Sequence, residues 1–95
     1  MARKMIVEID LNEVQTADQL HDLLSDRLDF PGWYGKNWNG FWDAISGLVE
    51  MPEVLRFIGW RAFNHRLPMD AGLMKSCLDQ MKNELPEMSP KVQYV

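Results

Sequence analysis

The sequence has few of the residues that stabilise small folds by cross-linking or metal binding: one cysteine and two histidines in 95 residues. One cysteine cannot close a disulfide within the chain, and the cysteines and histidines lack the spacing of a zinc site. Long apolar runs are missing too, and the first residues, MARKMIVEID, contain no signal-peptide apolar stretch. We therefore expect a cytoplasmic protein that has no cofactor, no structural metal and no membrane segment.

Basic residues are also scarce, and the formal net charge is -4. Residues 1–53 hold four Lys or Arg against ten Asp or Glu, a balance of -6, whereas residues 54–95 hold six against four, a balance of +2. Affinity for nucleic acids comes mainly from basic side chains that displace counterions from the phosphates. The acidic first half therefore argues against a nucleic-acid partner and favours a basic protein partner.

The remaining composition is that of one folded domain. Hydrophobic residues make up 46% of the chain and charged residues 25%, which is typical of soluble folded proteins. A chain of this length fits within a single ordinary domain, which we place at residues 1–95. Because a small domain buries a limited share of its surface, its aromatic residues must supply much of the core.

Short apolar segments alternate with stretches of helical periodicity. The patterns predict strands over 5–9, 54–58 and 92–95, the second buried on both faces, and helices after the caps Thr16, Asn37 and Asp70, with one or two further turns over 60–67. Strands separated by helices favour a parallel arrangement, since parallel strands need long crossovers. The predicted fold is therefore α/β, with a small three-stranded parallel sheet packed by helices.

The segment before the second helix is an aromatic loop. Pro31 and Gly32 precede Trp33 and Tyr34, and proline and glycine are typical of loops. Asn37 is a good cap for a helix from about 38 to about 46, with Gly47 where helices often end. Six residues of this segment share one side and are expected to pack inward: Trp38, Phe41, Trp42, Ile45, Leu48 and Val49.

The opposite side of the second helix has unusually small side chains. It consists chiefly of Asn39, Gly40, Asp43, Ser46 and Gly47. A glycine inside a helix costs about 1 kcal/mol relative to alanine, so Gly40 needs a reason. Small residues could let a partner approach the backbone, with Asp43 accepting two hydrogen bonds from a guanidinium. Alternatively, Gly40 admits a neighbouring helix of the same fold and Asp43 is an ordinary solvated acid.

Other kinds of chemistry have little support in the sequence. Cys77 lies on the apolar side of the last helix with no histidine nearby, which is typical of a buried structural thiol. His21 lies off the leucine side of the first helix, and a metal site with Asp18 and Asp22 is less plausible than a solvated acidic side. Exposed tryptophans could stack on bases, but such sites need a basic groove. We expect a binding protein rather than an enzyme.

Most of the chain resembles the barstar family of intracellular ribonuclease inhibitors. The resemblance is carried by Asp18-Gln19-Leu20-His21, Trp33-Tyr34-Gly35-Lys36-Asn37, Phe41-Trp42-Asp43, Gly47-Leu48-Val49-Glu50 and Trp60-Arg61-Ala62-Phe63. It implies a three-stranded parallel sheet packed by helices. It also implies that the loop and the second helix block a ribonuclease active site, with Asp43 in the place of a substrate phosphate.

The resemblance also implies a set of partner-binding residues: Trp33, Gly35, Asn37, Trp38, Asn39, Trp42, Asp43, Gly47 and, beside the acidic contact position of the last helix near Asn83, Glu84. Asn39 replaces a family acid and Leu48 replaces an aromatic residue, so we expect a different cognate enzyme or weaker binding to the best-known one. The predicted function is a stoichiometric immunity protein, of the toxin–antitoxin type, against a basic bacterial ribonuclease. The alternative is an interaction module for a partner that is not a nuclease.

Overall fold

The protein folds as a sheet covered by helices, in the order that the sequence predicts. The computed structural model describes residues 3–95. Along the chain it contains β1 (Ile6–Asp10), α1 (Ala17–Leu28), α2 (Trp38–Asp43), the π-helical turn η1 (Ala44–Leu48), β2 (Val54–Ile58), α3 (Trp60–Arg66), α4 (Pro68–Glu84) and β3 (Lys91–Tyr94). The predicted α/β architecture is confirmed.

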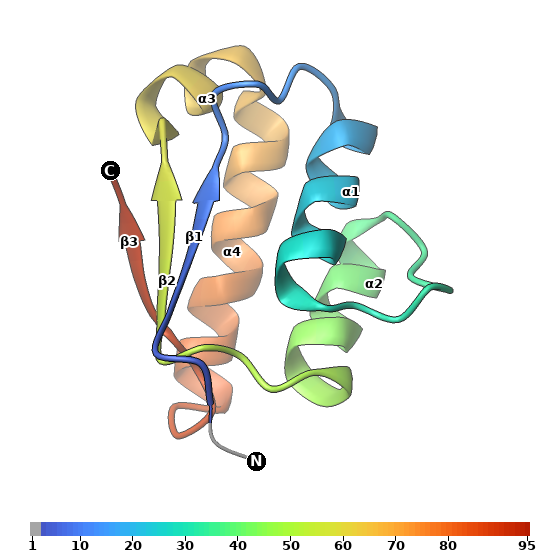
Figure 1. Ribbon diagram of the computed structural model, residues 1–95, viewed down its shortest axis with the longest axis vertical. Helices are drawn as coiled ribbons and strands as arrows, with labels where there is room; N and C mark the ends of the chain where they lie inside the picture. Colours follow the sequence, from blue (N-terminus) through green and yellow to red (C-terminus); the bar gives the residue numbers. More distant parts are fainter. Residues whose placement is uncertain (1–2) are drawn as a thin grey trace.

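The three strands form one parallel sheet in the order β1-β2-β3. Leu55 of β2 lies opposite Val7 of β1 and opposite Val92 of β3, so these side chains share the face that the helices cover. Figure 1 shows α1 and α4 beside the sheet, while α2 lies on the side of the molecule farthest from β3. The segment with the predicted binding residues is thus remote from the β3 edge of the sheet.

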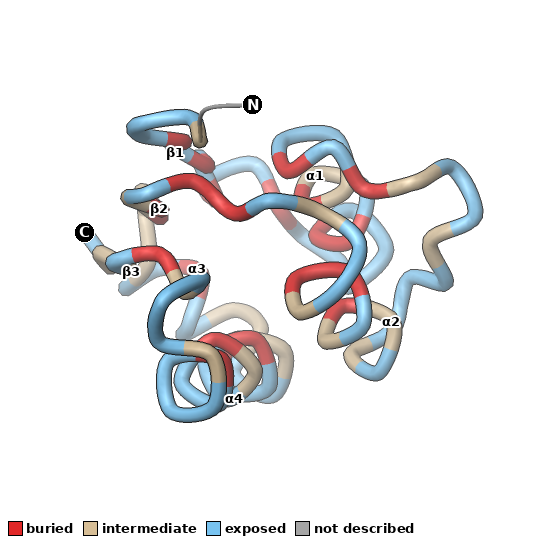
Figure 2. Tube along the Cα trace, turned by 90° about the horizontal axis from the view of Figure 1, so that it is seen from below, coloured by how far each residue is buried: buried red, intermediate tan, exposed pale blue. Residues whose placement is uncertain are grey.

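The core extends from the sheet to α2. Phe57 of β2, Phe63 of α3 and Phe41 of α2 are all fully buried. Figure 2 shows buried segments on the inward sides of the strands and of α1, α2 and α4. Burial of a phenylalanine side chain is worth about 1.5–3 kcal/mol. Because Phe41 contributes to this core, α2 has a fixed side toward the protein and a defined side toward solvent.

One face of the sheet remains open, which corrects the prediction that β2 is buried on both faces. Leu55 and Phe57 are buried, but the alternate residues of β2 are only partly buried. On the open face, Arg56 Nη1 lies 2.7 Å from Glu8 Oε2, and Arg56 Nε donates to Gln93 Oε1 at 2.8 Å. This polar row across all three strands explains an arginine in the middle of an apolar strand.

The helix starts agree with the predictions in two cases out of three. Thr16 Oγ1 accepts a hydrogen bond from Gln19 N at 3.1 Å, which confirms the predicted cap of α1. Asn37 caps α2, as expected. Asp70 does not cap α4, because that helix already begins at Pro68, where proline's missing N–H costs nothing. Asp70 instead lies in the first turn of α4.

Within residues 3–95, each helix is too short or too polar to cross a membrane.

Candidate protein-binding face

The loop before α2 is fixed by the side chain of Asn37. Its Oδ1 accepts a hydrogen bond from Gly40 N at 2.6 Å, and its Nδ2 donates to Gly35 O at 3.0 Å. One side chain therefore satisfies a free amide at the start of the helix and also closes the end of the loop. Lys36, between them, adopts a left-handed backbone with φ of 52°.

Asp43 is exposed at the end of α2, and its carboxylate has no ion-pair partner within residues 3–95. Among the residues that the structure describes, no basic group lies within 4.0 Å of its carboxylate. The loop cation Lys36 is bound elsewhere, with its Nζ 2.8 Å from Asp22 Oδ1 of α1. That hydrogen bond raises the pKa of Lys36. Asp43 is thus available to a cation from a partner.

The helix after Asp43 continues as a π turn, which changes two predictions. Val49 N donates to Ala44 O at 3.1 Å, a bond that spans five residues instead of four. The helix ends at Leu48 rather than near 46, so Gly47 lies inside the final turn and does not cap it. Each residue of a wider turn rotates less about the axis, and this swings Leu48 outward to an exposed fraction of 46%. The expectation that Leu48 packs inward was wrong.

The two glycines of this segment have different surroundings. A Cβ on Gly40 would lie 3.3 Å from Asn37 Oδ1 and 3.5 Å from the Tyr34 ring. Gly40 therefore makes room for the protein's own loop, and not for a neighbouring helix or a partner. A Cβ on Gly47 would meet no atom within 4 Å. Of the two, Gly47 is the one that leaves space facing solvent.

The predicted binding residues lie mostly on one continuous segment, the loop with α2 and η1. Trp33 is 72% exposed, and Asn39, Asp43 and Gly47 are exposed as well, whereas Trp38 and Trp42 are half-buried against the core. Glu84 is exposed at the last residue of α4, and within residues 3–95 no hydrogen bond joins it to this segment. Five exposed residues of this segment are the candidates for contact with a partner, and we call them the binding face: Trp33, Asn39, Asp43, Gly47 and Leu48.

A buried polar cluster behind the binding face was missed by sequence reasoning. His21, expected on the acidic side of α1, is only 3% exposed, and its Nδ1 lies 2.6 Å from the Tyr34 hydroxyl. Its ring also packs on Trp38, with ring centres 4.5 Å apart. The signal was present in the sequence, since His21 precedes Leu24 by three residues and Leu28 by seven, which places it on their side of the helix.

The same cluster includes two residues of α4. Trp38 Nε1 donates to Asp70 Oδ1 at 3.1 Å, and Cys77 Sγ lies 3.9 Å from Trp38 O. Burial raises the pKa of the Cys77 thiol and lowers that of His21. The thiol is thus kept protonated, as expected for a structural cysteine rather than a nucleophile.

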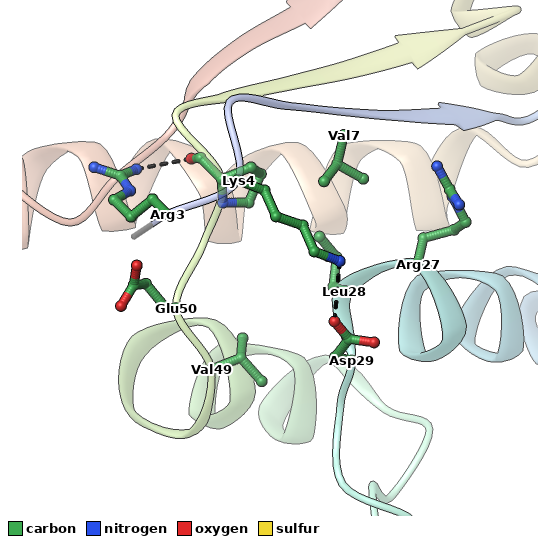
Figure 3. A pocket seen from close by; sticks show the side chains of 9 residues that line it. Arg3, Lys4, Val7, Arg27, Leu28, Asp29, Val49 and Glu50 are labelled. Atoms are coloured by element: carbon green, nitrogen blue, oxygen red, sulfur yellow. Dashed lines mark hydrogen bonds and ion pairs between the residues drawn. The ribbon is translucent and has the colours of Figure 1, made fainter. Parts of the chain in front are cut away.

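A separate hollow of about 310 Å³ lies between the start of the chain, the end of α1 and the residues after η1. Figure 3 shows Lys4 pointing to Asp29, with Arg3 bound to a carbonyl oxygen of the chain. Arg27 likewise donates to Glu8 O at 2.9 Å. The cations around this hollow are therefore already engaged by the protein.

In residues 3–95, no group of three or more histidine, cysteine or acidic side chains could hold a metal ion.

Comparison with known proteins assigns the chain to a family. The family model described as Barstar (barnase inhibitor) matches residues 4–95. The chain belongs to the barstar family. A protein of Bacillus subtilis (strain 168), named "Putative ribonuclease inhibitor YrdF", is 33% identical over 85 residues, which cover 90% of this chain and 91% of that protein. Both matches support a role in ribonuclease inhibition, the barstar-family function that the motifs imply.

Proposed function

We propose that this barstar-family protein is a stoichiometric inhibitor of a bacterial ribonuclease, and that its binding face covers the active site of that enzyme. The observation that carries the proposal is Asp43, which is exposed and, within the described chain, has no internal ion-pair partner. A ribonuclease must bind the phosphates of RNA, so its active site offers cationic groups to an anion. Asp43 supplies an anion of suitable size on a rigid helix.

Rigidity of the helix makes the mimicry efficient. The fully buried residues Phe41, Ala44 and Ile45 flank Asp43 in sequence and hold its backbone in place. Its carboxylate can accept two hydrogen bonds from one guanidinium without first breaking an ion pair to any residue of 3–95. Binding then costs little reorganisation, which favours slow dissociation.

The rest of the binding face is adapted to close contact rather than to strong charge. Trp33 offers a large rigid surface of the kind that dominates interface energies, and Gly47 leaves the helix backbone accessible. Asn39 is neutral, so the face has one acid fewer than the family pattern. We expect a basic cognate ribonuclease with fewer cations opposite this helix, which the inhibitor neutralises in the cytoplasm of the producing bacterium.

An inhibition assay tests the proposal. The purified protein is titrated against barnase and a panel of other secreted bacterial ribonucleases while cleavage of a fluorogenic RNA is followed. We expect complete inhibition of at least one enzyme at a one-to-one ratio. Removing one partner of a buried charge pair costs about 2–5 kcal/mol, so Asp43→Ala should weaken inhibition roughly thirtyfold or more.

Asp26→Ala is the matched control, because Asp26 is an exposed acid of α1 outside the binding face. It removes the same charge and should leave inhibition nearly unchanged. Failure to inhibit any basic ribonuclease, or equal loss in both variants, would contradict the proposal. Capture of a regulatory or structural partner in its place would support the interaction-module alternative.

A further inference from the structure

The indole of Trp38 is bound within the protein, although the family resemblance places this residue among the partner contacts. Its Nε1 donates to Asp70 Oδ1 at 3.1 Å, and its ring packs between His21, at 4.5 Å, and Phe41, at 5.2 Å, between ring centres. Trp38 is half-buried, and so is Asp70. The polar atom of the indole is therefore not available to a partner.

This hydrogen bond joins the first residue of α2 to the first turn of α4. The helix α2 has only six residues and continues into a π turn, so it has little stability of its own. Beyond its first turn, α2 is held to the core by buried Phe41, and the η1 turn that follows is held by buried Ala44 and Ile45. At its amino-terminal end, the side chain of Trp38 is bonded to Asp70 of α4, its carbonyl lies 3.9 Å from Cys77 Sγ of the same helix, and His21 of α1 bonds Tyr34 in the adjoining loop.

We propose that Asp70 is a positioning residue, which fixes the start of α2 through Trp38 and thereby sets the direction in which Asp43 leaves the protein. The proposal rests on the proposed inhibitor function for its effect on binding. Its structural part concerns the free protein alone. In this arrangement Trp38 is a support for the binding face and not a part of it.

The chemistry of the pair explains why an acid is used. An ionised carboxylate accepts a stronger hydrogen bond than a neutral group does. Loss of the acceptor would leave the indole N–H unpaired at a half-buried site. The attachment of α2 to α4 would then be weakened by more than the hydrogen bond itself contributes. The start of α2 would then open more often, and the loop with Trp33 would move with it.

Hydrogen exchange and inhibition are measured on Asp70→Ala, Asp70→Asn and the control Asp79→Ala. Asp79 belongs to the same helix but pairs with Lys75 at 3.1 Å on the exposed side, so this control removes equal charge. The informative amides are those of Tyr34, Gly40 and Phe41, which are bonded at the loop and the start of α2. The amides of Val54 and Lys91 in the sheet serve as the reference.

In the free protein we expect Asp70→Ala to speed exchange at the three informative amides about tenfold while the reference amides change little. Asp70→Asn keeps an acceptor oxygen and should stay within about threefold of the original protein. Against the inhibited ribonuclease, Asp70→Ala should raise the dissociation rate about tenfold with a smaller change in the association rate. Adding Asp70→Ala to Trp38→Phe, which already lacks the indole N–H, should have no further effect on exchange.

Three results would overturn the inference in the free protein. The first is unchanged exchange at the start of α2 in Asp70→Ala. The second is an equal increase across the whole chain, which would make the bond an ordinary contribution to stability. The third is an equal effect of Asp70→Ala and Asp70→Asn, which would assign the effect to charge, against the proposed bond. If the original protein inhibits no ribonuclease, the proposed function fails, and the exchange data still decide whether Asp70 positions α2.

Discussion

Replacement of Gly47 by alanine should make the protein more stable and the inhibitor weaker. Gly47 lies in the last helical turn, and its φ is outside the left-handed region, so alanine can adopt its backbone conformation. The added Cβ would meet no atom within 4 Å. In the absence of a partner, the substitution therefore acts on the free energy of unfolding by lowering the conformational entropy of the unfolded chain.

The magnitude follows from the position of Gly47. In the interior of an α-helix, glycine is about 1 kcal/mol less favourable than alanine. The final turn is less demanding than an interior one, so we expect Gly47→Ala to raise the free energy of unfolding by roughly 0.5 kcal/mol. On the binding face the same methyl group stands where a partner would approach the backbone. Overpacking of a close contact costs about 1–3 kcal/mol, which corresponds to roughly five- to 150-fold in affinity.

Urea denaturation and ribonuclease inhibition measure the two effects separately. Gly72→Ala is the matched control, because Gly72 is exposed within α4, has equally open surroundings and lies outside the binding face. It should stabilise the protein by about 1 kcal/mol and leave inhibition unchanged. Unaltered inhibition by Gly47→Ala would remove Gly47 from the interface, and loss of stability would show that the π turn itself requires glycine.

Three further predictions concern the polar groups inside the protein. Tyr34→Phe removes the hydroxyl bonded to His21 and should lower the free energy of unfolding by about 1–2 kcal/mol in urea denaturation, with a flat result refuting the bond. Tyr94→Phe should have no cost or a small gain in the same assay, because within the described chain that buried hydroxyl has no partner. The pKa of His21 lies below its usual 6.5, chiefly because burial outweighs the opposing charges of Asp70, Asp18 and Asp22. The unfolded chain therefore takes up a proton at a higher pH than the folded protein does. The free energy of unfolding should decrease as pH drops through about 6.5, and it should decrease less steeply in His21→Gln. Equal slopes of the free energy of unfolding against pH in the two proteins would contradict this.

The fold could be predicted because its signals are local and periodic. Leucines four residues apart define α1, and Asn37 marks the start of α2, so these elements follow from spacing and caps alone. The outward direction of Asp43 follows from the same periodicity. Features that depend on distant neighbours could not be obtained in this way.

The π turn and the buried cluster are such features. Nothing in the sequence of η1 distinguishes a π turn from an α turn, so the outward position of Leu48 follows only from the structure. The partner of Trp38 lies 32 residues away on another helix, beyond the reach of any helical repeat. Gly40 likewise depends on the folded loop, because a Cβ there would press on the Asn37 side chain that closes the loop.

The position of the last residue has a practical consequence. Val95 extends the sheet, with its N–H bonded to Phe57 O at 2.9 Å and its carbonyl accepting from Trp60 N at 3.0 Å. Figures 1 and 2 place this end of the chain on the opposite side of the molecule from α2. A tether attached at Val95 would leave α2 on the side of the molecule that faces away from a sensor chip. Immobilisation at Val95 therefore suits kinetic measurements of binding through α2.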